Sequence, residues 1–328
     1  MQSPHHDRFQ YFREQSNTSN DYYISYVRPF VAIGSHTTVL EIGCGEGGNL
    51  LPFACLGCKV TGIDKDPERI RQAIMFFRES GKEGQFILSD FMSYPCPKMV
   101  SERFDVILVH DVIEHIQPSE KYSFFMHIHG FLKHDGIVFF GFPAWHNPFG
   151  GHQQISVGFA SRLPFIHLLP NCIYKGLLYR SGASREQIDE LMLIKQARMT
   201  IEQFDKLAMS TGYRIADRTL WLVNPHYKQK FNLSARRLWP LLSSLPYIRN
   251  YFTTSAFYIL SDKLDSEKET LSASFQQVNK FVSTMNNDYL CYVNRGRARH
   301  RPKDILQFFM KKGVRVTERP ATKRLHPI

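Results

Sequence analysis

The chain has 328 residues, of which 43% are hydrophobic, and its formal net charge is +11. This length allows one large domain with elaborations or two small ones, and this apolar content excludes a wholly disordered chain. The N-terminus contains no apolar segment of the secretory type, and no apolar run approaches the roughly 18 residues that cross a bilayer. We therefore expect a cytoplasmic protein.

The positive charge is concentrated at the C-terminal end. Eleven Lys and Arg residues and two acids lie from Arg295 onward, so this tail carries +9 and the rest of the chain +2. A near-neutral body argues against a catalytic face that grips a phosphate backbone. We expect the tail to be solvated. The alternative is that the tail makes weak contact with nucleic acid or with an anionic membrane, in which case the protein would be peripheral to that membrane.

Six cysteines are too few for a disulfide scaffold in a chain of this length. Cys55 and Cys58 are spaced like half of a zinc site, but neither a second pair nor histidines at ligand spacing accompany them. We interpret them as a structural thiol pair and predict no metal site.

Strand and helix patterns alternate along the chain. Apolar runs predict strands at residues 38–42, 59–63, 85–88, 104–109 and 137–142, and later at 213–223 and 254–261. Helical patterns cover the 14 residues after Gly43 and residues 67–77, 118–132, 200–211 and 266–285. Strands that alternate with helices predict a doubly wound α/β fold with a parallel sheet, whose ligand site lies at the carboxyl ends of the strands.

The loop after the first predicted strand is rich in glycine and opens onto a helix. Gly43, Gly45 and Gly48 satisfy the G-x-G-x-x-G pattern of dinucleotide-binding loops, so a nicotinamide or flavin cofactor is one candidate ligand. Glu41 and Glu46 place negative charge before and within this loop, where it opposes a pyrophosphate. Acids at these positions favour a cationic ligand, such as a sulfonium with an α-amino group.

Residues 39–47, Val-Leu-Glu-Ile-Gly-Cys-Gly-Glu-Gly, resemble the first signature of class I S-adenosylmethionine-dependent methyltransferases. Residues 62–64 resemble the segment whose carboxylate accepts two ribose hydroxyls in that family, and residues 89–91 the segment whose acid meets the adenine amino group. Residues 104–115 resemble the fourth segment, which ends in a Glu-His pair common in the subgroup that includes bacterial quinone-biosynthesis methyltransferases.

This resemblance implies S-adenosylmethionine as the cofactor, S-adenosylhomocysteine as its product, and a seven-stranded, mostly parallel Rossmann-like sheet with helical insertions after strands five and six. The cofactor-binding residues that it implies are Glu41, Gly43, Cys44, Gly45, Glu46, Gly47, Asp64, Lys65, Asp90, Phe91 and His110. The expected domain ranges are an N-terminal helical cap at 1–37, the cofactor-binding core at 38–143, a substrate-binding helical insertion at 144–199, the end of the sheet at 200–261 with a second insertion at 224–251, and a helical extension with the basic tail at 262–328.

The first insertion leaves the predicted fifth strand at the rim that carries the cofactor, which makes it the natural place for an acceptor pocket. Its first dozen residues combine aromatic, glycine, histidine and amide side chains. Trp145, Phe149 and Gln153 are expected to bind the substrate. His146 and His152 are candidate bases for a hydroxyl acceptor, because imidazole titrates near neutral pH, and structural hydrogen bonding is the alternative for both.

Glu114 and His115 are interpreted as a structural pair at the start of a helix. The predicted function is transfer of a methyl group to a small-molecule acceptor, through an oxygen on a sugar, lipid-linked or secondary-metabolite substrate. An RNA or protein methyltransferase that uses the basic tail is one alternative, and a cofactor-binding module without catalysis is another. The near-neutral body opposes the RNA or protein methyltransferase, and the intact acids at the cofactor positions oppose the module without catalysis. No oligomeric state is predicted.

Overall fold

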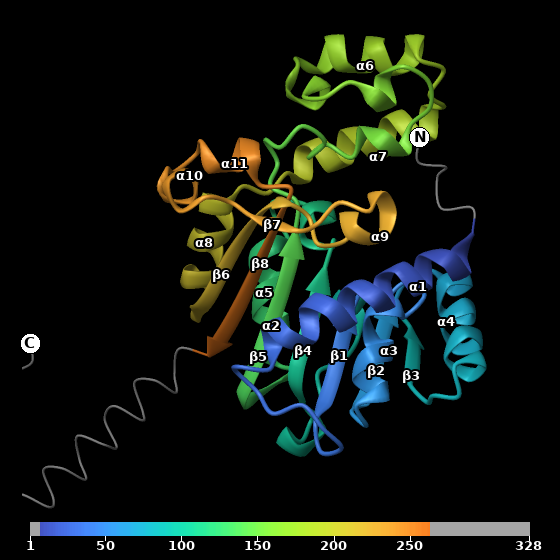
Figure 1. Ribbon diagram of the computed structural model, residues 1–328, viewed down its shortest axis with the longest axis vertical. Coiled ribbons are helices and arrows are strands. Elements are labelled where there is room, and N and C mark those ends of the chain that lie inside the picture. The colour runs from blue at the N-terminus through green and yellow to red at the C-terminus, as the bar shows by residue number, and fades with distance from the viewer. Residues whose placement is uncertain (1–6, 263–328) are drawn as a thin grey trace, which may run out of the picture. The chain divides into compact units, whose positions relative to one another are not determined.

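An eight-stranded sheet forms the centre of residues 7–262, the part of the chain that this computed structural model describes (Figure 1). Its strands are β1 (Thr38–Ile42), β2 (Lys59–Asp64), β3 (Gln85–Leu88), β4 (Phe104–His110), β5 (Leu132–Phe142), β6 (Tyr213–Val223), β7 (Arg236–Arg237) and β8 (Ser255–Asp262). They lie in the order β3-β2-β1-β4-β5-β8-β6-β7, with β1 to β5 parallel and β8 antiparallel to both of its neighbours. The predicted doubly wound, mostly parallel α/β sheet is confirmed.

The strand β7 adds one strand to the seven that the sequence predicts. Its two residues belong to the second insertion and pair antiparallel with Trp221 and Val223 of β6. A chain that returns along an edge strand satisfies backbone groups that would otherwise lack partners. Two residues are too few to show a periodicity, so the sequence contains no signal for this strand.

Helices lie on both faces of the sheet and build the insertions. They are α1 (Arg8–Thr18), α2 (Ile24–Val27), α3 (Leu51–Cys55), α4 (Pro67–Glu79), α5 (Lys121–His129), α6 (Asn171–Arg180), α7 (Arg185–Ala197), α8 (Ile201–Ser210), α9 (Tyr227–Phe231), α10 (Pro240–Ser244) and α11 (Arg249–Phe252). Two of them are shorter than predicted. The residues after Gly43 form a loop and a 3-10 turn before α3 begins, and α5 ends early because Leu132 already pairs with Phe104 as the start of β5.

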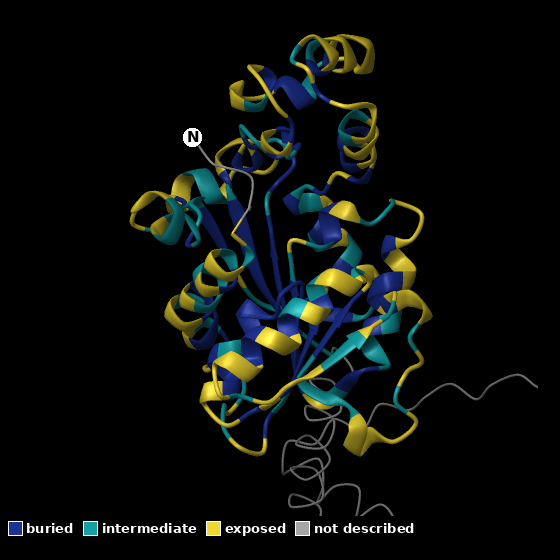
Figure 2. Ribbon diagram, turned by 90° about the vertical axis from the view of Figure 1, so that its right-hand side faces the viewer, coloured by how far each residue is buried: buried dark blue, intermediate teal, exposed yellow. Residues whose placement is uncertain are grey.

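The sheet separates two hydrophobic layers, because successive side chains of a strand point to opposite faces. Leu40 and Ile107 pack in the layer that contains α5 and α8, whereas Val39 and Leu108 pack in the layer that contains α1 to α4. Buried residues accordingly gather in the strands and on the inner faces of the helices, and exposed residues lie on the outer faces (Figure 2). Burial on both faces explains why the central strands are continuous apolar runs.

The chain order of the strands reverses at β1, which lies between β2 and β4. Connections on the two sides of such a reversal lead away from each other, which leaves a crevice at the carboxyl ends of the strands. The loops after β1 and β4 frame this crevice. The structure therefore places the glycine loop and the Glu-His pair at the same edge of the sheet.

The first insertion has a small core of its own between β5 and α8. Tyr174, Leu178 and Leu191 pack together there, away from the two layers of the sheet. At its base the Trp145 N–H donates to the Met199 carbonyl at 2.8 Å, which ties the two ends of the insertion together.

The second insertion carries α9, β7, α10 and α11. Arg249 of α11 forms ion pairs with Glu202 and Asp205 of α8, at 2.9 and 3.4 Å. These contacts attach α11 to the helix α8, whereas Lys228 of α9 pairs with Asp21 of the N-terminal segment at 3.0 Å.

The described residues fall within one of the two compact units of the chain, Met1–Glu267. The helix predicted at 266–285 and the basic tail lie outside the described residues, and the division into the predicted domain ranges stays a prediction. Within residues 7–262, no helix is both long and apolar enough to cross a membrane.

The substitution Thr200→Ala should lower the free energy of unfolding by about 1 kcal/mol. Thr200 precedes α8, where its hydroxyl accepts from the Gln203 N–H at 3.2 Å and Gln203 Oε1 accepts from the Thr200 N–H at 3.0 Å. Urea unfolding followed by circular dichroism measures the loss. Thr200→Ser keeps the hydroxyl and is the control; equal stability of the two variants would contradict this cap.

Candidate functional site

The glycine loop, residues 43–47, turns between β1 and a 3-10 turn at Gly48–Leu50. Gly45 has a φ of +52°, which L side chains rarely adopt. A Cβ built there would meet only Arg69 Nη1 within 4 Å, at 3.9 Å. Gly45 is buried, yet little packs against its Cα, so the loop leaves room for a ligand to approach its backbone closely.

The neighbouring residues of the loop pack inward. The Gly43 N–H donates to the Ile63 carbonyl at 2.8 Å, which joins the loop to the end of β2. Cys44 is 1% exposed, and a Cβ at Gly62 would lie 2.6 Å from its Sγ. Beyond it, a Cβ at Gly47 would lie 2.9 Å from the Phe86 ring. These contacts fix the loop from below and leave its upper side to a ligand.

Two carboxylates are buried beside the loop, each with one oxygen that has no hydrogen-bond partner within residues 7–262. Glu41 Oε1 accepts from Asn49 Nδ2 at 2.7 Å, and Glu46 Oε1 accepts from Arg8 Nη1 at 3.1 Å. Burial raises the pKa of Glu41 to about 8, because desolvation outweighs the hydrogen bond from Asn49. The second oxygens of both residues are free to accept from a cationic ligand.

Asp64 ends β2 with both carboxylate oxygens oriented by backbone donors. Oδ2 accepts from the Gly45 N–H at 2.8 Å, and Oδ1 accepts from the Asp66 N–H at 2.9 Å. Each oxygen keeps a lone pair for a further donor. Asp64 thus links the glycine loop to the next loop and can accept from hydroxyl groups.

The three predicted residues at the ends of β2 and β3 have different environments. Asp90 is exposed, and it caps a 3-10 turn by accepting from the Met92 N–H at 2.9 Å. Phe91 is buried in the core, edge-on to Phe124, and its carbonyl lies 3.0 Å from His127 Nε2. Lys65 is exposed.

His110 ends β4 with its ring held by its neighbours. Its Nε2 lies 2.7 Å from the Tyr23 hydroxyl, its Nδ1 lies 3.3 Å from Asp111 Oδ2, and a Cβ at Gly141 would lie 2.3 Å from the ring. Burial alone raises the pKa of Asp111, but the charge and hydrogen bond of His110 outweigh it and hold that pKa well below its usual range. A negative charge therefore stands directly after the carboxyl end of β4.

The helix α1 lies over the glycine loop (Figure 1). A Cβ at Gly48 would come within 2.5 Å of the Phe12 carbonyl oxygen, so helix and turn meet backbone to backbone. The ion pair of Arg8 with Glu46 joins the start of the helix to the loop. The N-terminal segment thereby shields this side of the loop from solvent.

The substitution Arg8→Gln should lower the free energy of unfolding by about 1 kcal/mol, because it leaves the Glu46 carboxylate buried without its partner. Solvent screens part of the cost of this unpaired charge, since the Arg8 side chain is 40% exposed. Arg13→Gln removes the same charge from an exposed position of the same helix and is the matched control. Chemical unfolding at pH 7 compares them. Equal losses in the two variants would show that the ion pair adds no stability.

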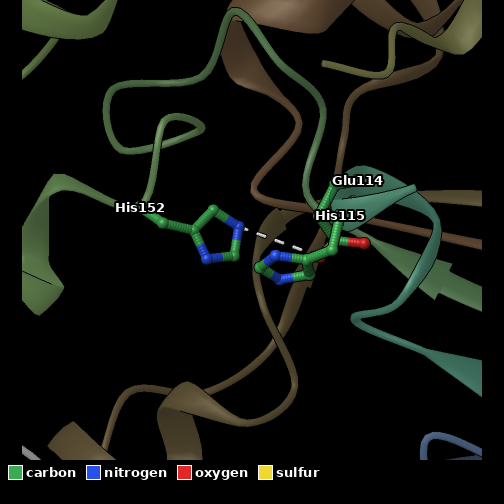
Figure 3. A group of neighbouring side chains, drawn as sticks. All are labelled: Glu114, His115 and His152. Atoms are coloured by element: carbon green, nitrogen blue, oxygen red, sulfur yellow. Dashed lines mark ion pairs between the residues drawn. The ribbon is translucent and has the colours of Figure 1, made fainter. Parts of the chain in front are cut away.

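Glu114, His115 and His152, which we name the Glu-His-His cluster, come together from two loops (Figure 3). The first two lie in a 3-10 turn after β4, and His152 lies after β5 with a φ of +56°. Glu114 Oε1 is 3.8 Å from His152 Nε2, and the two imidazole rings meet edge to face with centroids 5.2 Å apart. Neither Glu114 oxygen has a hydrogen-bond partner within the described residues, although the side chain is 3% exposed.

Burial dominates the electrostatics of the cluster. It raises the pKa of Glu114 well above the usual range, and the charge of Asp111 adds to this effect. It lowers the pKa of His152, and it lowers that of His115 to about 4. The N-cap residue of this turn is Val112, which offers no side-chain cap, and the structural role that we expected of the pair stays a prediction.

Trp145 and Gln153 hold the first insertion together. The Trp145 carbonyl accepts from His167 Nε2 at 2.8 Å, and its indole is 5% exposed. Gln153 is fully buried, and its Nε2 donates to the carbonyls of Pro148 and Leu163 at 3.0 and 3.1 Å. These contacts shape the loop that carries His152, whereas a direct substrate contact of either side chain stays a prediction.

Phe149 is half-buried, and its N–H donates to Asn147 Oδ1 at 2.9 Å. The ring of His146 lies against Tyr251 of α11, with centroids 5.1 Å apart, and burial lowers its pKa. Of the two candidate bases, His152 is the one that the structure places beside Glu114. The Glu-His pair was visible in the sequence, but its contact with His152 is visible only in the structure.

The buried acids fit S-adenosylmethionine. The unpartnered oxygens of Glu41 and Glu46 match a cationic ligand with N–H donors, the oriented carboxylate of Asp64 matches a diol, and the open backbone at Gly45 admits close approach. A pyrophosphate would meet the carboxylates instead, which opposes the dinucleotide alternative.

The family match of the chain covers the region that contains the glycine loop and the cofactor acids. Residues 39–136 match a family described as a methyltransferase domain. An uncharacterized methyltransferase of Mycobacterium bovis is 27% identical over 118 residues, which are 36% of this chain and 43% of that protein. A ubiquinone biosynthesis O-methyltransferase of Methylobacterium sp. is 36% identical over 81 residues, 24% of this chain and 30% of that protein. The matched segments thus span less than half the length of these curated relatives.

The fold extends further than the sequence similarity. The PH0226 protein of Pyrococcus horikoshii has the same fold with a TM-score of 0.50 and 14% identity, over 80% of this chain and 96% of that one. Residues 39–136 thus match a methyltransferase domain, and the geometry of the site resembles that of the class I S-adenosylmethionine-dependent methyltransferases. S-Adenosylmethionine is the cofactor of this class.

Proposed function

We propose that the protein transfers a methyl group from S-adenosylmethionine to an oxygen of a small-molecule acceptor. The observation that carries this proposal is the Glu-His-His cluster, in which a buried carboxylate without hydrogen-bond partners faces His152 from the first insertion. The cluster lies after β4 and β5, at the same edge of the sheet as the cofactor acids. An oxygen nucleophile must lose a proton, and Glu114 and His152 are groups that can direct its loss.

The cofactor supplies an electrophilic methyl group. The chain therefore has to bind the cofactor and the acceptor, orient them for transfer, and exclude water. Glu41, Glu46 and Asp64 would hold the cofactor at the ends of β1 and β2, where α1 covers the loop. The buried amide of Gln153 holds the loop of the first insertion that carries His152 toward the acceptor side. A dry crevice strengthens each of these interactions.

Full-length protein incubated with S-adenosylmethionine that carries a labelled methyl group should transfer the label to the small-molecule fraction of a cell extract. Asp64→Asn protein should transfer little, because it binds the cofactor poorly. Label in RNA or protein that disappears when Arg295, Arg297, Arg299 and Arg301 are changed to Gln would favour the macromolecular alternative and contradict our proposal. Cofactor binding without transfer to any fraction would indicate a non-catalytic module.

A further inference from the structure

The Glu-His-His cluster contains one more group than a base and its supporting acid require. His115 adds a second imidazole, and its ring meets that of His152 (Figure 3). One ligand-type atom from each of the three residues lies within 4.8 Å of the other two. Two imidazole nitrogens and one carboxylate oxygen at this spacing form a donor set that metalloenzymes use for divalent transition metals, with coordination positions left open.

Ionisation of Glu114 in this place requires a cation. The side chain is 3% exposed and neither oxygen has a hydrogen-bond partner within the described residues, an arrangement that is costly for a carboxylate. Lys121, whose charge acts on Glu114, donates its Nζ protons to the carbonyls of Ala197 and Arg198. Asp111 adds a second negative charge that acts on Glu114 and His152.

We propose that Glu114, His115 and His152 bind a divalent transition-metal ion that holds the acceptor oxygen opposite the cofactor methyl group. Ligand atoms about 2.1 Å from an ion are closer to one another than the atoms of the cluster, so binding draws the three side chains inward. The inference rests on the proposed function for the acceptor, but the ion site itself does not. Such an ion would lower the pKa of the acceptor hydroxyl group as it binds, so that its proton would leave to bulk solvent before the crevice excludes water.

The prediction of no metal site rests on ligand spacing within single segments. In this cluster two ligands follow β4 and the third follows β5, so no short motif contains all three. The loop that carries His152 is held by Gln153, whose buried amide bonds two backbone carbonyls next to it. That loop geometry, rather than sequence spacing, brings the third ligand to the pair.

Calorimetric titration of chelator-treated, full-length protein with Zn²⁺ and with Mn²⁺ tests the site directly. We expect one equivalent of ion per chain, with at least 100-fold weaker binding after Glu114→Gln or His152→Gln. Co²⁺ should give visible absorption bands of a nitrogen and oxygen site, a signature independent of activity. His36→Gln and Glu83→Gln, at exposed positions outside the cluster, are the matched controls and should bind the ion normally.

Unchanged S-adenosylmethionine affinity in the cluster variants shows that they fold. Absence of ion binding, or binding that survives both cluster substitutions, would overturn the inference. Methyl transfer at full rate in chelated protein would overturn the role of the ion and leave the proposed function intact. Specific ion binding without transfer to any small molecule would instead contradict the proposed function and leave the metal site standing.

Discussion

Protein that carries Asp64→Asn should bind S-adenosylmethionine about 100-fold more weakly than the unchanged chain. The family signature implies that this carboxylate accepts from two ribose hydroxyls, and hydrogen bonds to a charged acceptor contribute about 1.5–3 kcal/mol each. The same carboxylate accepts from the Gly45 and Asp66 N–H groups, one on each oxygen. Asparagine offers one acceptor oxygen, so its amide would face an N–H donor and displace the glycine loop as well.

Asp66→Asn is the matched control for that change. Asp66 lies two residues further along and caps α4 by accepting from the Glu68 and Arg69 N–H groups. Asparagine caps a helix about as well as aspartate, so this variant loses the same charge and keeps its local structure. Calorimetric titration compares the two; a loss of similar size in both, or a change below about threefold in Asp64→Asn, would refute the role of Asp64 in cofactor binding.

Glu41→Gln should stabilise the protein without cofactor and weaken cofactor binding. Burial raises the pKa of Glu41 from 4.5 to about 8. At pH values below 4.5 the group is protonated in both states and costs nothing, but as the pH rises towards 8 folding must take up a proton and stability falls. One pKa unit corresponds to about 1.4 kcal/mol, so glutamine should recover at most about 5 kcal/mol at pH 8 and almost nothing at pH 4.5.

Cofactor binding should reverse this gain. A cationic ligand beside the free Oε2 favours the ionised carboxylate, so binding at pH 7 should release a proton from the unchanged protein and none from Glu41→Gln. Urea unfolding at several pH values and titrations in buffers of different ionisation enthalpy measure the two effects. Glu79→Gln, on the exposed end of α4, should show neither. A stability difference that does not vary with pH would contradict the assignment.

The agreement between sequence and structure is strongest where one strand end determines the chemistry. Glu41 and Asp64 lie at the ends of adjacent parallel strands, so recognising the strands already places both acids at one edge of the sheet. Agreement is weaker for Phe91, which follows its strand end as predicted but packs its ring into the core. A sequence pattern does not say which way a side chain turns at the end of a strand.

The sequence by itself therefore determined the doubly wound fold, the glycine loop and the acids that accompany it, because periodicity and strand-end chemistry are local properties. Only the tertiary structure decided that α1 covers the loop, that β7 extends the sheet, and that His152 meets Glu114 and His115. Those contacts join segments far apart in the chain, and their geometry depends on how the loops after β4 and β5 pack. No local pattern encodes that packing, which is why the sequence shows the pair but not the third member of the cluster.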